Sequence, residues 1–455
     1  MKRDFRGRRV AVVGLGLSHR ALIRFLLERG ALITACDRKE AGELGEVRSQ
    51  LATRGVRFLL GADYLRGLAD CELAFLTPGM PKHLPEVEAA RRRGVPLLGE
   101  AGLFLELCAA PVTGVTGSAG KTTTTSLVAA ILERAGRRVF LGGNIGRPLI
   151  AEVDAIPAAA EAVLELSSFQ LQLAETSPQV AVLLNVTPNH LDVHRDLAEY
   201  REAKAQIFRR QQPEEVLVAN RDDPGARELA ETAPSRVLWF SRREVLAEGA
   251  FLSDGWLQVR WEGRSQRLLP AGELALPGVH NLENALAAAG AAAARGAAPE
   301  AMAAVLREFR GVPHRLEQVA DCQGVRWYND SIATTPERTL AALATLPPPL
   351  VLIAGGYDKH LDYAVLGPAV RRQVRVLLLI GQTAAKIEAA VREAAGGELP
   401  VIRRLPDLAA AVEEARRLAR PGDTVVLSPA SASYDQFTDF EQRGELFRRL
   451  VTGAG

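Results

Sequence analysis

One stretch decides the fold of this chain: Gly114-Val115-Thr116-Gly117-Ser118-Ala119-Gly120-Lys121-Thr122-Thr123-Thr124-Thr125. It follows a short extended segment at 110–113 and leads into 126–132, whose apolar spacing is helical. A strand, a glycine-rich loop and a helix in this order suit a polyphosphate, because the loop N–H groups turn inward and the helix N-terminus is partly positive. Lys121 adds a full charge, and Thr122 supplies a hydroxyl at the position that usually holds Mg²⁺. The stretch predicts a nucleoside-triphosphate site.

The glycines of this stretch are spaced differently from those of the common phosphate-binding loop, G-x-x-x-x-G-K-[ST]. The residue five before Gly120 is Val115, and the glycines fall at 114, 117 and 120 instead. A glycine-rich turn at the surface is the alternative interpretation. The strand before the loop and the threonine-rich helix start after it favour the phosphate site.

The composition is that of a globular protein with several domains. A length of 455 residues suggests about three domains at roughly 150 residues each. Apolar residues make up 47% and charged residues 24%, which are the usual proportions of a soluble protein. The 56 basic and 54 acidic residues nearly balance, so no charge excess points to nucleic acid or to a membrane surface.

Cysteine usage and hydropathy indicate the cellular compartment of the protein. The four cysteines, at 36, 71, 108 and 322, form no C-x-x-C pair, which favours a reducing cytoplasm over a disulfide framework or a zinc site. The apolar run at 10–13 is interrupted by Gly14 and Gly16, too early for a signal peptide. No stretch approaches the roughly 18 to 20 apolar residues of a membrane span. We expect a cytoplasmic monomer without membrane insertion.

The N-terminal residues predict a nucleotide-binding βαβ unit. A strand at 9–13, a Gly-x-Gly turn at 14–18, a helix at 21–29 and a second strand at 32–36 lead to Asp37. An acidic residue at that distance is typical of a dinucleotide site. His19, however, replaces the third glycine of that fingerprint. A nicotinamide cofactor and another nucleotide both remain possible ligands.

Two polar residues of the middle segment are candidates for the triphosphate site. Glu165 ends the apolar strand at 162–168, and a carboxylate there is costly to bury without a partner. We assign it to Mg²⁺, with a capping or salt-bridged glutamate as the alternative. Asn144 lies in the loop at 142–146, where its side chain could reach a ligand.

Further along, His190, Asp192 and His194 invite a zinc interpretation on a helix. Pro188 places His190 at a strand-to-helix loop instead, where the two histidines need not share a face. Lys204, judged by its helical neighbours alone, is a solvated surface lysine.

The alanine-rich helix at 285–295 is preceded by two asparagines. Asn281 and Asn284 are three residues apart at the helix start and so share one face. They could bind an adenine or ribose edge, and helix capping is the alternative.

The last 140 or so residues alternate strand and helix, which predicts a second open parallel sheet. Three loops there, at 327–334, 355–359 and 427–437, are rich in polar groups and each follows an apolar strand. Open α/β sheets bind ligands at such strand ends. Ordinary turn chemistry is the alternative for each loop taken separately.

The order of these motifs resembles that of the Mur ligases, and the match covers essentially the whole chain. The motifs that carry the resemblance are the phosphate loop Thr116–Thr124, Gly142–Gly146, Glu165–Leu171, Asn189–Asp192, His280-Asn281, Pro313–Arg315, Asn329–Ser331 and Leu427–Ala430.

The resemblance implies an α/β enzyme of three domains: an N-terminal Rossmann-like UDP-binding domain at 1–108, a central P-loop ATPase domain at 109–311 and a C-terminal Rossmann-like, amino-acid-binding domain at 312–455. It implies an ATP- and Mg²⁺-dependent ligase that adds D-glutamate to UDP-N-acetylmuramoyl-L-alanine through an acyl phosphate, in cytoplasmic peptidoglycan precursor synthesis. Neither nucleic acid nor a membrane is an expected partner.

Carried over position by position, the resemblance implies catalytic roles for Lys121, His190 and Lys204. The implied ATP contacts are Gly117, Ser118, Ala119, Gly120, Lys121, Thr122, Thr123, Asn281, Asn284, Arg315 and Asp330. The implied Mg²⁺ ligands are Thr122, Glu165, His190 and Lys204, the last as a carbamate formed with CO₂, which reverses its assignment to the surface. The implied substrate contacts are Leu17, Ser18, Asp37, Arg38, Gly79 and Asn144 for the UDP-sugar, and Thr334, Lys359, Ser433 and Phe440 for glutamate.

Two positions depart from the family pattern. Many members have a lysine where this chain has Ile332 and an acidic residue where it has Tyr357. Both lie near the implied amino-acid site, so the stereochemistry of the glutamate remains open, with L-glutamate as the alternative. A folylpolyglutamate-synthase-like ligase is a second alternative, although those enzymes lack the domain of about a hundred residues before the phosphate loop. A nucleotide-binding regulatory protein is the alternative from another class.

Overall fold

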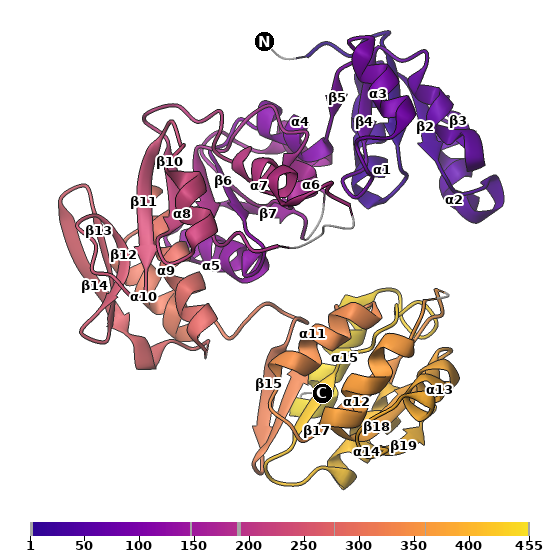
Figure 1. Cartoon of the computed structure of the whole chain (residues 1–455), viewed down its shortest axis with the longest axis vertical. Helices are drawn as coiled ribbons and strands as arrows, with labels where there is room; N and C mark the ends of the chain where they lie inside the picture. The colour runs from indigo at the N-terminus through magenta and orange to yellow at the C-terminus, as the bar shows by residue number, and fades with distance from the viewer. Residues whose placement is uncertain (1–2, 146–147, 189–192, 277, 360, 454–455) are drawn as a thin grey trace. The chain divides into compact units, whose positions relative to one another are not determined.

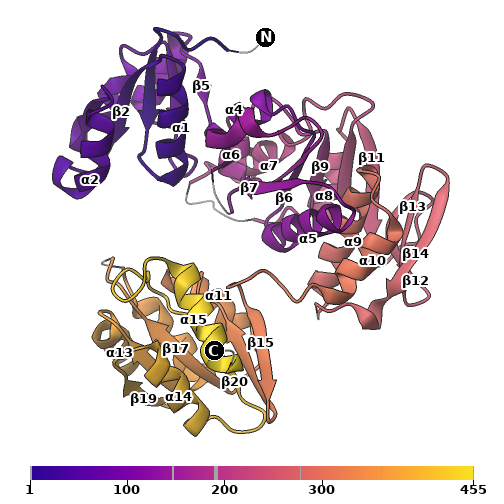
Figure 2. The same ribbon diagram turned by 180° about the vertical axis from the view of Figure 1, so that it is seen from behind.

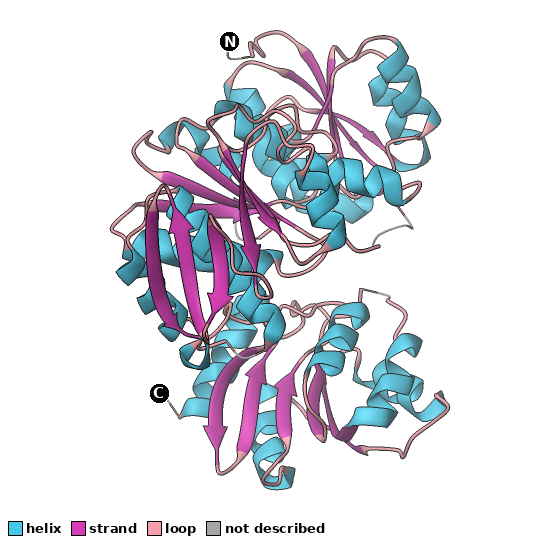
Figure 3. Cartoon of the chain, turned by 60° about the vertical axis from the view of Figure 1, so that its left-hand side comes forward, coloured by secondary structure: helices cyan, strands magenta, loops and turns pink. Residues whose placement is uncertain are grey.

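The computed structural model describes residues 3–145, 148–188, 193–276, 278–359 and 361–453 (Figure 1). The chain divides into two compact units, Met1–Phe309 and Arg310–Gly455. The described residues form three β-sheets flanked by helices, and this confirms the α/β class (Figure 3). The domain boundaries expected after residues 108 and 311 stay predictions. Among the described residues, no helix is both long enough and apolar enough to cross a membrane.

The N-terminal sheet is parallel throughout, with strand order β3-β2-β1-β4-β5. Helix α1 starts directly after Gly16, so Leu17 and Ser18 lie in its first turn. The loops after β1 and β4 lie side by side, because these strands are neighbours in the sheet. The elements are β1 (Arg9–Val13), α1 (Leu17–Glu28), β2 (Leu32–Asp37), α2 (Ala41–Ala52), β3 (Arg57–Leu60), η1 (Gly61–Leu68), β4 (Leu73–Leu76), α3 (Pro85–Arg92), β5 (Leu97–Leu98) and α4 (Glu100–Leu107).

The middle sheet has nine strands in the order β14-β13-β12-β11-β10-β9-β6-β8-β7. It is parallel from β7 to β12, and β13 and β14 continue it as antiparallel strands. The strands are β6 (Val112–Thr116), β7 (Val139–Gly143), β8 (Glu161–Glu165), β9 (Val180–Leu183), β10 (Val216–Asn220), β11 (Arg236–Ser241), β12 (Gly249–Ser253), β13 (Trp256–Trp261) and β14 (Arg264–Pro270). The helices are α5 (Lys121–Arg134), η2 (Leu149–Ala155), α6 (Ser168–Leu171), α7 (Leu197–Ala205), α8 (Pro224–Ala230), η3 (Ala271–Glu273), α9 (Val279–Ala294) and α10 (Pro299–Glu308).

Both faces of the central strands of this sheet, β6, β8, β9 and β10, are buried, as their continuous apolar runs predict. Helices α5, α9 and α10 pack together on one face, where alternate strand residues such as Val115, Val182 and Val218 join their core (Figure 2). Helices α6, α7 and α8 cover the other face, where Leu183 and Leu217 point. The strand ends between these two layers are therefore fixed from both sides.

The C-terminal sheet has the order β15-β16-β20-β17-β18-β19, in which only β15 is antiparallel. Because β16, β20 and β17 are neighbours, the three polar loops that follow them lie side by side. The strands are β15 (Glu317–Cys322), β16 (Val325–Asn329), β17 (Leu350–Gly355), β18 (Val374–Ile380), β19 (Val401–Arg404) and β20 (Thr424–Leu427). The helices are α11 (Pro336–Thr345), η4 (Ala364–Leu366), α12 (Gly367–Gln373), α13 (Ala384–Glu393), α14 (Leu408–Leu418) and α15 (Phe440–Thr452).

Candidate active site

The phosphate loop, residues 117–120, joins the end of β6 to the start of α5. Gly120 is the N-cap of α5 and adopts a left-handed conformation with φ of 85°. A Cβ atom at Gly120 would lie 2.3 Å from Asn284 Oδ1, and one at Gly117 would lie 2.8 Å from the Cβ of Leu184. A side chain at either position would therefore force these neighbours to shift, and at Gly120 it would also strain the backbone. The loop therefore presents bare backbone at a helix N-terminus, which is the arrangement that binds a phosphate chain.

Asn185 holds this loop in place. Its Oδ1 accepts a hydrogen bond from Ala119 N at 2.8 Å, its Nδ2 donates to Ala119 O at 3.2 Å, and its carbonyl accepts from Ser118 N. The hydroxyl of Ser118 also lies 2.8 Å from Tyr200 Oη on α7. The sequence-based site did not include Asn185. Its position two residues after β9, the strand beside β6, was the available signal.

The charge of Lys121 lies along the loop. Its Nζ donates to the carbonyls of Gly117 at 2.9 Å and of Ser118 at 3.3 Å. The ammonium group thus reaches back over the residues that the sequence assigned to the phosphates.

Glu165 is paired with the phosphate-loop helix inside the protein. Its Oε2 accepts a 2.6 Å hydrogen bond from the Thr122 hydroxyl, and its Oε1 accepts from Asn144 Nδ2 at 2.9 Å. Both Thr122 and Glu165 are buried. A hydroxyl and a carboxylate at the end of a phosphate loop are the oxygen ligands that Mg²⁺ takes alongside water and phosphate. The structure brings together two of the four predicted metal ligands, and it places Asn144 beside them.

Lys204 is buried on α7 with 1% of its surface exposed, so the residue-based assignment to the surface is wrong. Its Nζ lies 4.7 Å from the centroid of the Tyr200 ring. Burial and, next, the positive charge of Lys121 lower the pKa of Lys204 well below its usual value. A buried amine that prefers its neutral form is the kind of lysine that reacts with electrophiles.

His190, predicted as a metal ligand and catalytic residue, lies outside the described residues, as does Asp192. Within the described ranges, no group of three or more His, Cys, Asp or Glu side chains could hold a metal ion. His194 is buried, with Nε2 3.0 Å from Ser168 Oγ and its ring stacked on Phe169 at 5.0 Å between centroids. These contacts account for His194 without zinc.

Asn281 and Asn284 share one face of α9, and neither is its N-cap, which is Gly278. Asn284 Nδ2 donates to Asn281 Oδ1 at 3.2 Å, and Asn284 Oδ1 accepts from Thr124 Oγ1 at 3.3 Å. The face borders a cavity of about 140 Å³ next to the phosphate loop, lined by Ala119, Gly120, Leu184, Asn185, Asn220, Phe240, His280, Glu283 and Asn284. A polar and partly apolar cavity beside a phosphate loop suits the nucleoside end of ATP.

Asp330 lies in the loop after β16 in the C-terminal unit. Its Oδ2 accepts from Ser428 Oγ at 2.8 Å, and its Oδ1 accepts from Leu316 N at 3.2 Å, next to Arg315. Burial raises the pKa of Asp330 to about 7, against the opposing effect of these hydrogen bonds and of Arg315. Arg315 and Asp330, both assigned to ATP, therefore belong to one connected turn.

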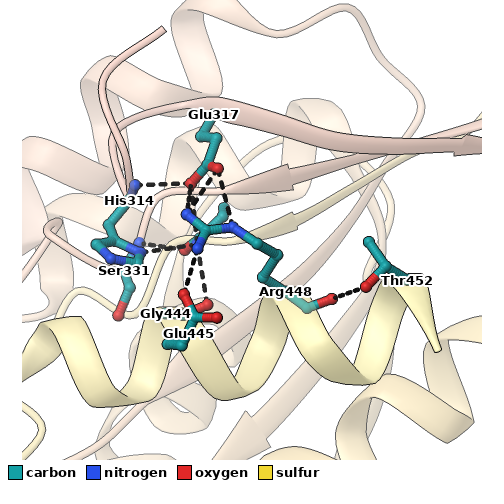
Figure 4. Close-up of polar contacts among 8 residues, drawn as sticks. His314, Glu317, Ser331, Gly444, Glu445, Arg448 and Thr452 are labelled. Atoms are coloured by element: carbon teal, nitrogen blue, oxygen red, sulfur yellow. Dashed lines mark hydrogen bonds and ion pairs between the residues drawn. The ribbon is translucent and has the colours of Figure 1, made fainter. Parts of the chain in front are cut away.

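A buried polar cluster behind this turn was absent from the sequence-based site (Figure 4). The two N–H donors of Asn329 Nδ2 are shared among three neighbours, His314 Nδ1 at 3.0 Å, Glu317 Oε2 at 3.3 Å and Gly444 O at 3.0 Å. Arg448 of α15 binds both carboxylate oxygens of Glu317, at 2.8 and 3.1 Å. The cluster ties the turn that carries Arg315 to β16 and to α15.

The residues assigned to glutamate lie in the same unit. Phe440 starts α15, and its carbonyl accepts from Ser331 Oγ at 2.8 Å. Ser433 is buried in the loop after β20, and Thr334 N bonds Ile332 O at 2.8 Å in the loop after β16. Lys359 follows β17, with its Nζ 5.4 Å from the centroid of the Tyr434 ring.

Five of the residues assigned to the UDP-sugar lie at the ends of β1, β2 and β4 of the N-terminal sheet, and the sixth, Asn144, follows β7 of the middle sheet. Asp37 Oδ2 accepts from Leu15 N at 2.7 Å, so this carboxylate closes the turn after β1. Leu17 is 76% exposed at the start of α1, and a Cβ atom at Gly79 would meet nothing within 4 Å. His19 is buried below the turn, with Nδ1 2.9 Å from Gly14 O. The turn is accessible at its rim, while a histidine fills the place of the third glycine.

Comparison with known proteins gives one consistent result. The models of the Mur ligase MurD-like N-terminal domain, the Mur ligase middle domain and the Mur ligase glutamate ligase domain match residues 8–99, 115–292 and 314–431. The UDP-N-acetylmuramoylalanine--D-glutamate ligase of Symbiobacterium thermophilum is 55% identical over 445 residues, which are 97% of each chain. The enzyme of the same name from Acetivibrio thermocellus is 44% identical over 455 residues, covering 99% of this chain and 97% of that one.

A solved structure agrees at the level of the fold. MurF from Acinetobacter baumannii has a TM-score of 0.56 and 19% identity, over 97% of this chain and 93% of that chain. The glycine loop, the Thr122–Glu165 pair and these full-length relatives lead to one conclusion: this chain belongs to the Mur ligase family.

Proposed function

We propose that this chain is an ATP-dependent ligase that joins D-glutamate to UDP-N-acetylmuramoyl-L-alanine and so serves peptidoglycan synthesis. The observation that carries the proposal is the buried contact between Thr122 and Glu165 beside the phosphate loop. The names of the full-length relatives, 55% and 44% identical, support the choice of substrates. The match of residues 8–99 to a MurD-like N-terminal domain weighs against a folylpolyglutamate-type ligase.

The chemistry takes two steps. The carboxylate of the muramoyl-alanine attacks the γ-phosphorus of ATP and ADP leaves, which gives an acyl phosphate. The neutral amine of glutamate then attacks the acyl carbon, the tetrahedral intermediate loses one proton from nitrogen to water or phosphate, and phosphate leaves as the amide forms. Two anions meet in the first step, so the site must neutralise charge. Lys121 and the phosphate-loop N–H groups do so here.

Magnesium, when bound, would supply further positive charge to offset that of the phosphates. Thr122 and Glu165 are the described residues that would hold it, since their oxygens lie together at the loop. We assign His190 and Lys204 to it as well. Lys204 is suited to this role as a carbamate, because its buried neutral amine can add CO₂ and release one proton. The resulting anion would lie near the positive charge of Lys121.

The substrates have separate places in the proposal. Leu17, Ser18, Asp37, Arg38, Gly79 and Asn144 are assigned to the UDP-sugar, and Thr334, Lys359, Ser433 and Phe440 to glutamate. Asn281, Asn284, Arg315 and Asp330 are assigned to the adenosine. A cytoplasmic location and a monomeric state also remain proposals. So does the absence of a nucleic-acid partner, which the near balance of 56 basic and 54 acidic residues supports.

Phosphate release tests the proposed function. The full chain is incubated with ATP, Mg²⁺ and UDP-N-acetylmuramoyl-L-alanine, together with D-glutamate, L-glutamate or no amino acid, and in a further arm with a folate and L-glutamate in place of the UDP-sugar. We expect release with D-glutamate alone, and none from Lys121→Ala. Release with L-glutamate would change the substrate and implicate Ile332 and Tyr357. Phosphate release only with a folate and L-glutamate would support the folate-type ligase. No phosphate release in any of the incubations would favour a nucleotide-binding regulator.

A further inference from the structure

Lys82 is a buried lysine that no step of the proposed chemistry uses. It lies two residues after the turn Thr77–Met80, which follows β4, and only 6% of its surface is exposed. Its Nζ donates to three carbonyl oxygens of that turn: Thr77 O at 3.0 Å, Pro78 O at 2.8 Å and Met80 O at 2.6 Å. Three acceptors match the three N–H donors of an ammonium group. The side chain therefore holds the backbone of the whole turn.

This turn forms one wall of the ligand edge of the N-terminal sheet. Thr77 N donates to Val13 O at 3.0 Å, and a Cβ atom at Gly14 would lie 2.8 Å from the Cβ of Thr77. The turns after β1 and β4 therefore touch. In the strand order β3-β2-β1-β4-β5 the connections reverse direction between β1 and β4, and open α/β sheets bind ligands at that point.

We propose that Lys82 is a positioning residue for the nucleotide-sugar substrate: its ammonium group fixes the Thr77–Met80 turn so that the backbone at Gly79 meets the substrate. The inference rests on the proposed function, because that function assigns Gly79 to the UDP-sugar. A lysine that only stabilises the N-terminal domain is the competing explanation. The two explanations differ in what they predict for substrate binding.

The surroundings of Lys82 make its role depend on pH. Burial lowers the pKa of Lys82 to about 8, and Glu199 of α7 opposes this shift. His19 of α1 faces it as a neutral ring, while Glu88, Arg91, Arg195 and His83 line a cavity of about 260 Å³ with it. Below pH 8 the ammonium serves all three carbonyls. Above pH 8 the neutral amine keeps two N–H donors, so one carbonyl of the turn loses its partner.

The stability of the folded chain should rise over the pH range in which substrate binding weakens. The pKa of Lys82 is lower in the folded chain than the ordinary 10.5, so the unfolded chain binds more protons between about pH 8 and 10.5. The contribution of this group to the free energy of unfolding therefore rises with pH in that window. A loss of substrate binding there cannot come from loss of stability through Lys82.

The test compares the full chain with Lys82→Met, Lys82→Arg and the control Arg92→Met, which removes one exposed charge from α3 of the same domain. KM for UDP-N-acetylmuramoyl-L-alanine is measured from pH 6.5 to 9.5 at saturating ATP and D-glutamate, and thermal unfolding is followed in parallel. We expect the wild-type KM to rise several-fold above pH 8. Lys82→Met should have a high KM at every pH. Lys82→Arg should have a lower KM than Lys82→Met, and this KM should not rise above pH 8, because arginine keeps its charge. KM for ATP and for D-glutamate should not change.

Each possible failure has a distinct meaning. A wild-type chain that does not turn over these substrates would overturn the proposed function. An active wild type together with a folded Lys82→Met variant of unchanged KM would overturn the positioning role alone. If Lys82→Met does not fold, Lys82→Arg decides, because a KM that still rises above pH 8 in that variant would assign the pH dependence to another group.

Discussion

The hydroxyl of Thr122 donates a 2.6 Å hydrogen bond to Glu165 Oε2, across 43 positions of sequence. The sheet explains why the two meet: β6 and β8 are neighbouring parallel strands, with Val115 opposite Glu165. The helix that begins after β6 thus places its first turn over the end of β8. The proposed metal pair is a consequence of the strand order.

Removing this hydroxyl should impair catalysis more than folding. Thr122→Val keeps the shape of the side chain and removes the oxygen, while Thr122→Ser keeps the oxygen. We expect Thr122→Val to lose roughly a hundredfold or more in phosphate release, and Thr122→Ser to stay within a few-fold of wild type. Titration with Mg²⁺ provides the check, because an active Thr122→Val variant with unchanged Mg²⁺ dependence would remove Thr122 from the metal site.

Much of this site could be predicted because its parts are local. The glycines at 117 and 120, Lys121 and Thr122 form one continuous stretch, and Glu165 ends an apolar strand. Each such signal can be recognised in a few residues. The three polar loops of the C-terminal unit were predicted in the same way, since each directly follows an apolar strand.

Patterns within a few residues do not reveal contacts that are made at long range. Lys204 looks exposed because its helix is rich in charged residues, and only the packing of α7 on the sheet buries it. Asn185, Asn329 and Lys82 act on backbone atoms of distant segments or of turns, and neither periodicity nor spacing records such contacts. The roles of His190 and Asp192 were expectations from a motif, and both residues lie outside the described ranges.

The glycine at position 120 should be irreplaceable for a steric reason beyond its backbone angle. Gly120 and Gly136 both have positive φ, 85° and 81°, but a Cβ atom at Gly136 would meet nothing within 4 Å. Gly136→Ala should therefore cost about 1 kcal/mol of stability and leave activity intact. Gly120→Ala should cost about 1 to 3 kcal/mol more and abolish ATP turnover, because its Cβ would meet Asn284. Thermal unfolding and phosphate release on both variants measure the difference, and equal behaviour would contradict the close packing at Asn284.

His19 should make the protein sensitive to acid. Its Nδ1 donates to Gly14 O, its buried Nε2 has no hydrogen-bond partner among the described residues, and burial lowers its pKa to about 4. The unfolded chain thus binds more protons below pH 6.5, so stability present above pH 6.5 is lost as the pH falls towards 4. His19→Asn keeps a donor near Gly14 O and cannot titrate. On acidification, the free energy of unfolding of this variant should fall by up to about 3 kcal/mol less than that of the wild type. Equal falls in both proteins would exclude His19 as the cause.

The Asn329 cluster should tolerate no exchange of donor for acceptor. Asn329→Asp would aim a carboxylate at the Glu317 carboxylate and at Gly444 O, both of them acceptors, beside His314 Nδ1. We expect the free energy of unfolding, measured by thermal unfolding, to fall by about 3 kcal/mol or more at neutral pH. The loss should shrink as the pH falls, because the new carboxyl titrates above its ordinary pKa and regains a donor. Tyr328→Phe removes only a 3.2 Å bond to Gln318 nearby and should be almost neutral in the same unfolding experiment.

Lys204 should be required as a carboxylate-bearing group rather than as a cation. Burial and the charge of Lys121 favour its neutral amine, which is the form that adds CO₂. Lys204→Ala should lose at least about a hundredfold in activity and recover part of it with short carboxylic acids that take the place of the carbamate. Lys204→Arg, which stays cationic and cannot form the carbamate, should remain inactive with or without these acids. Carbon NMR with isotope-labelled bicarbonate should show a carbamate signal in the wild type and none in Lys204→Arg. A fully active Lys204→Ala variant would leave Lys204 with no catalytic role.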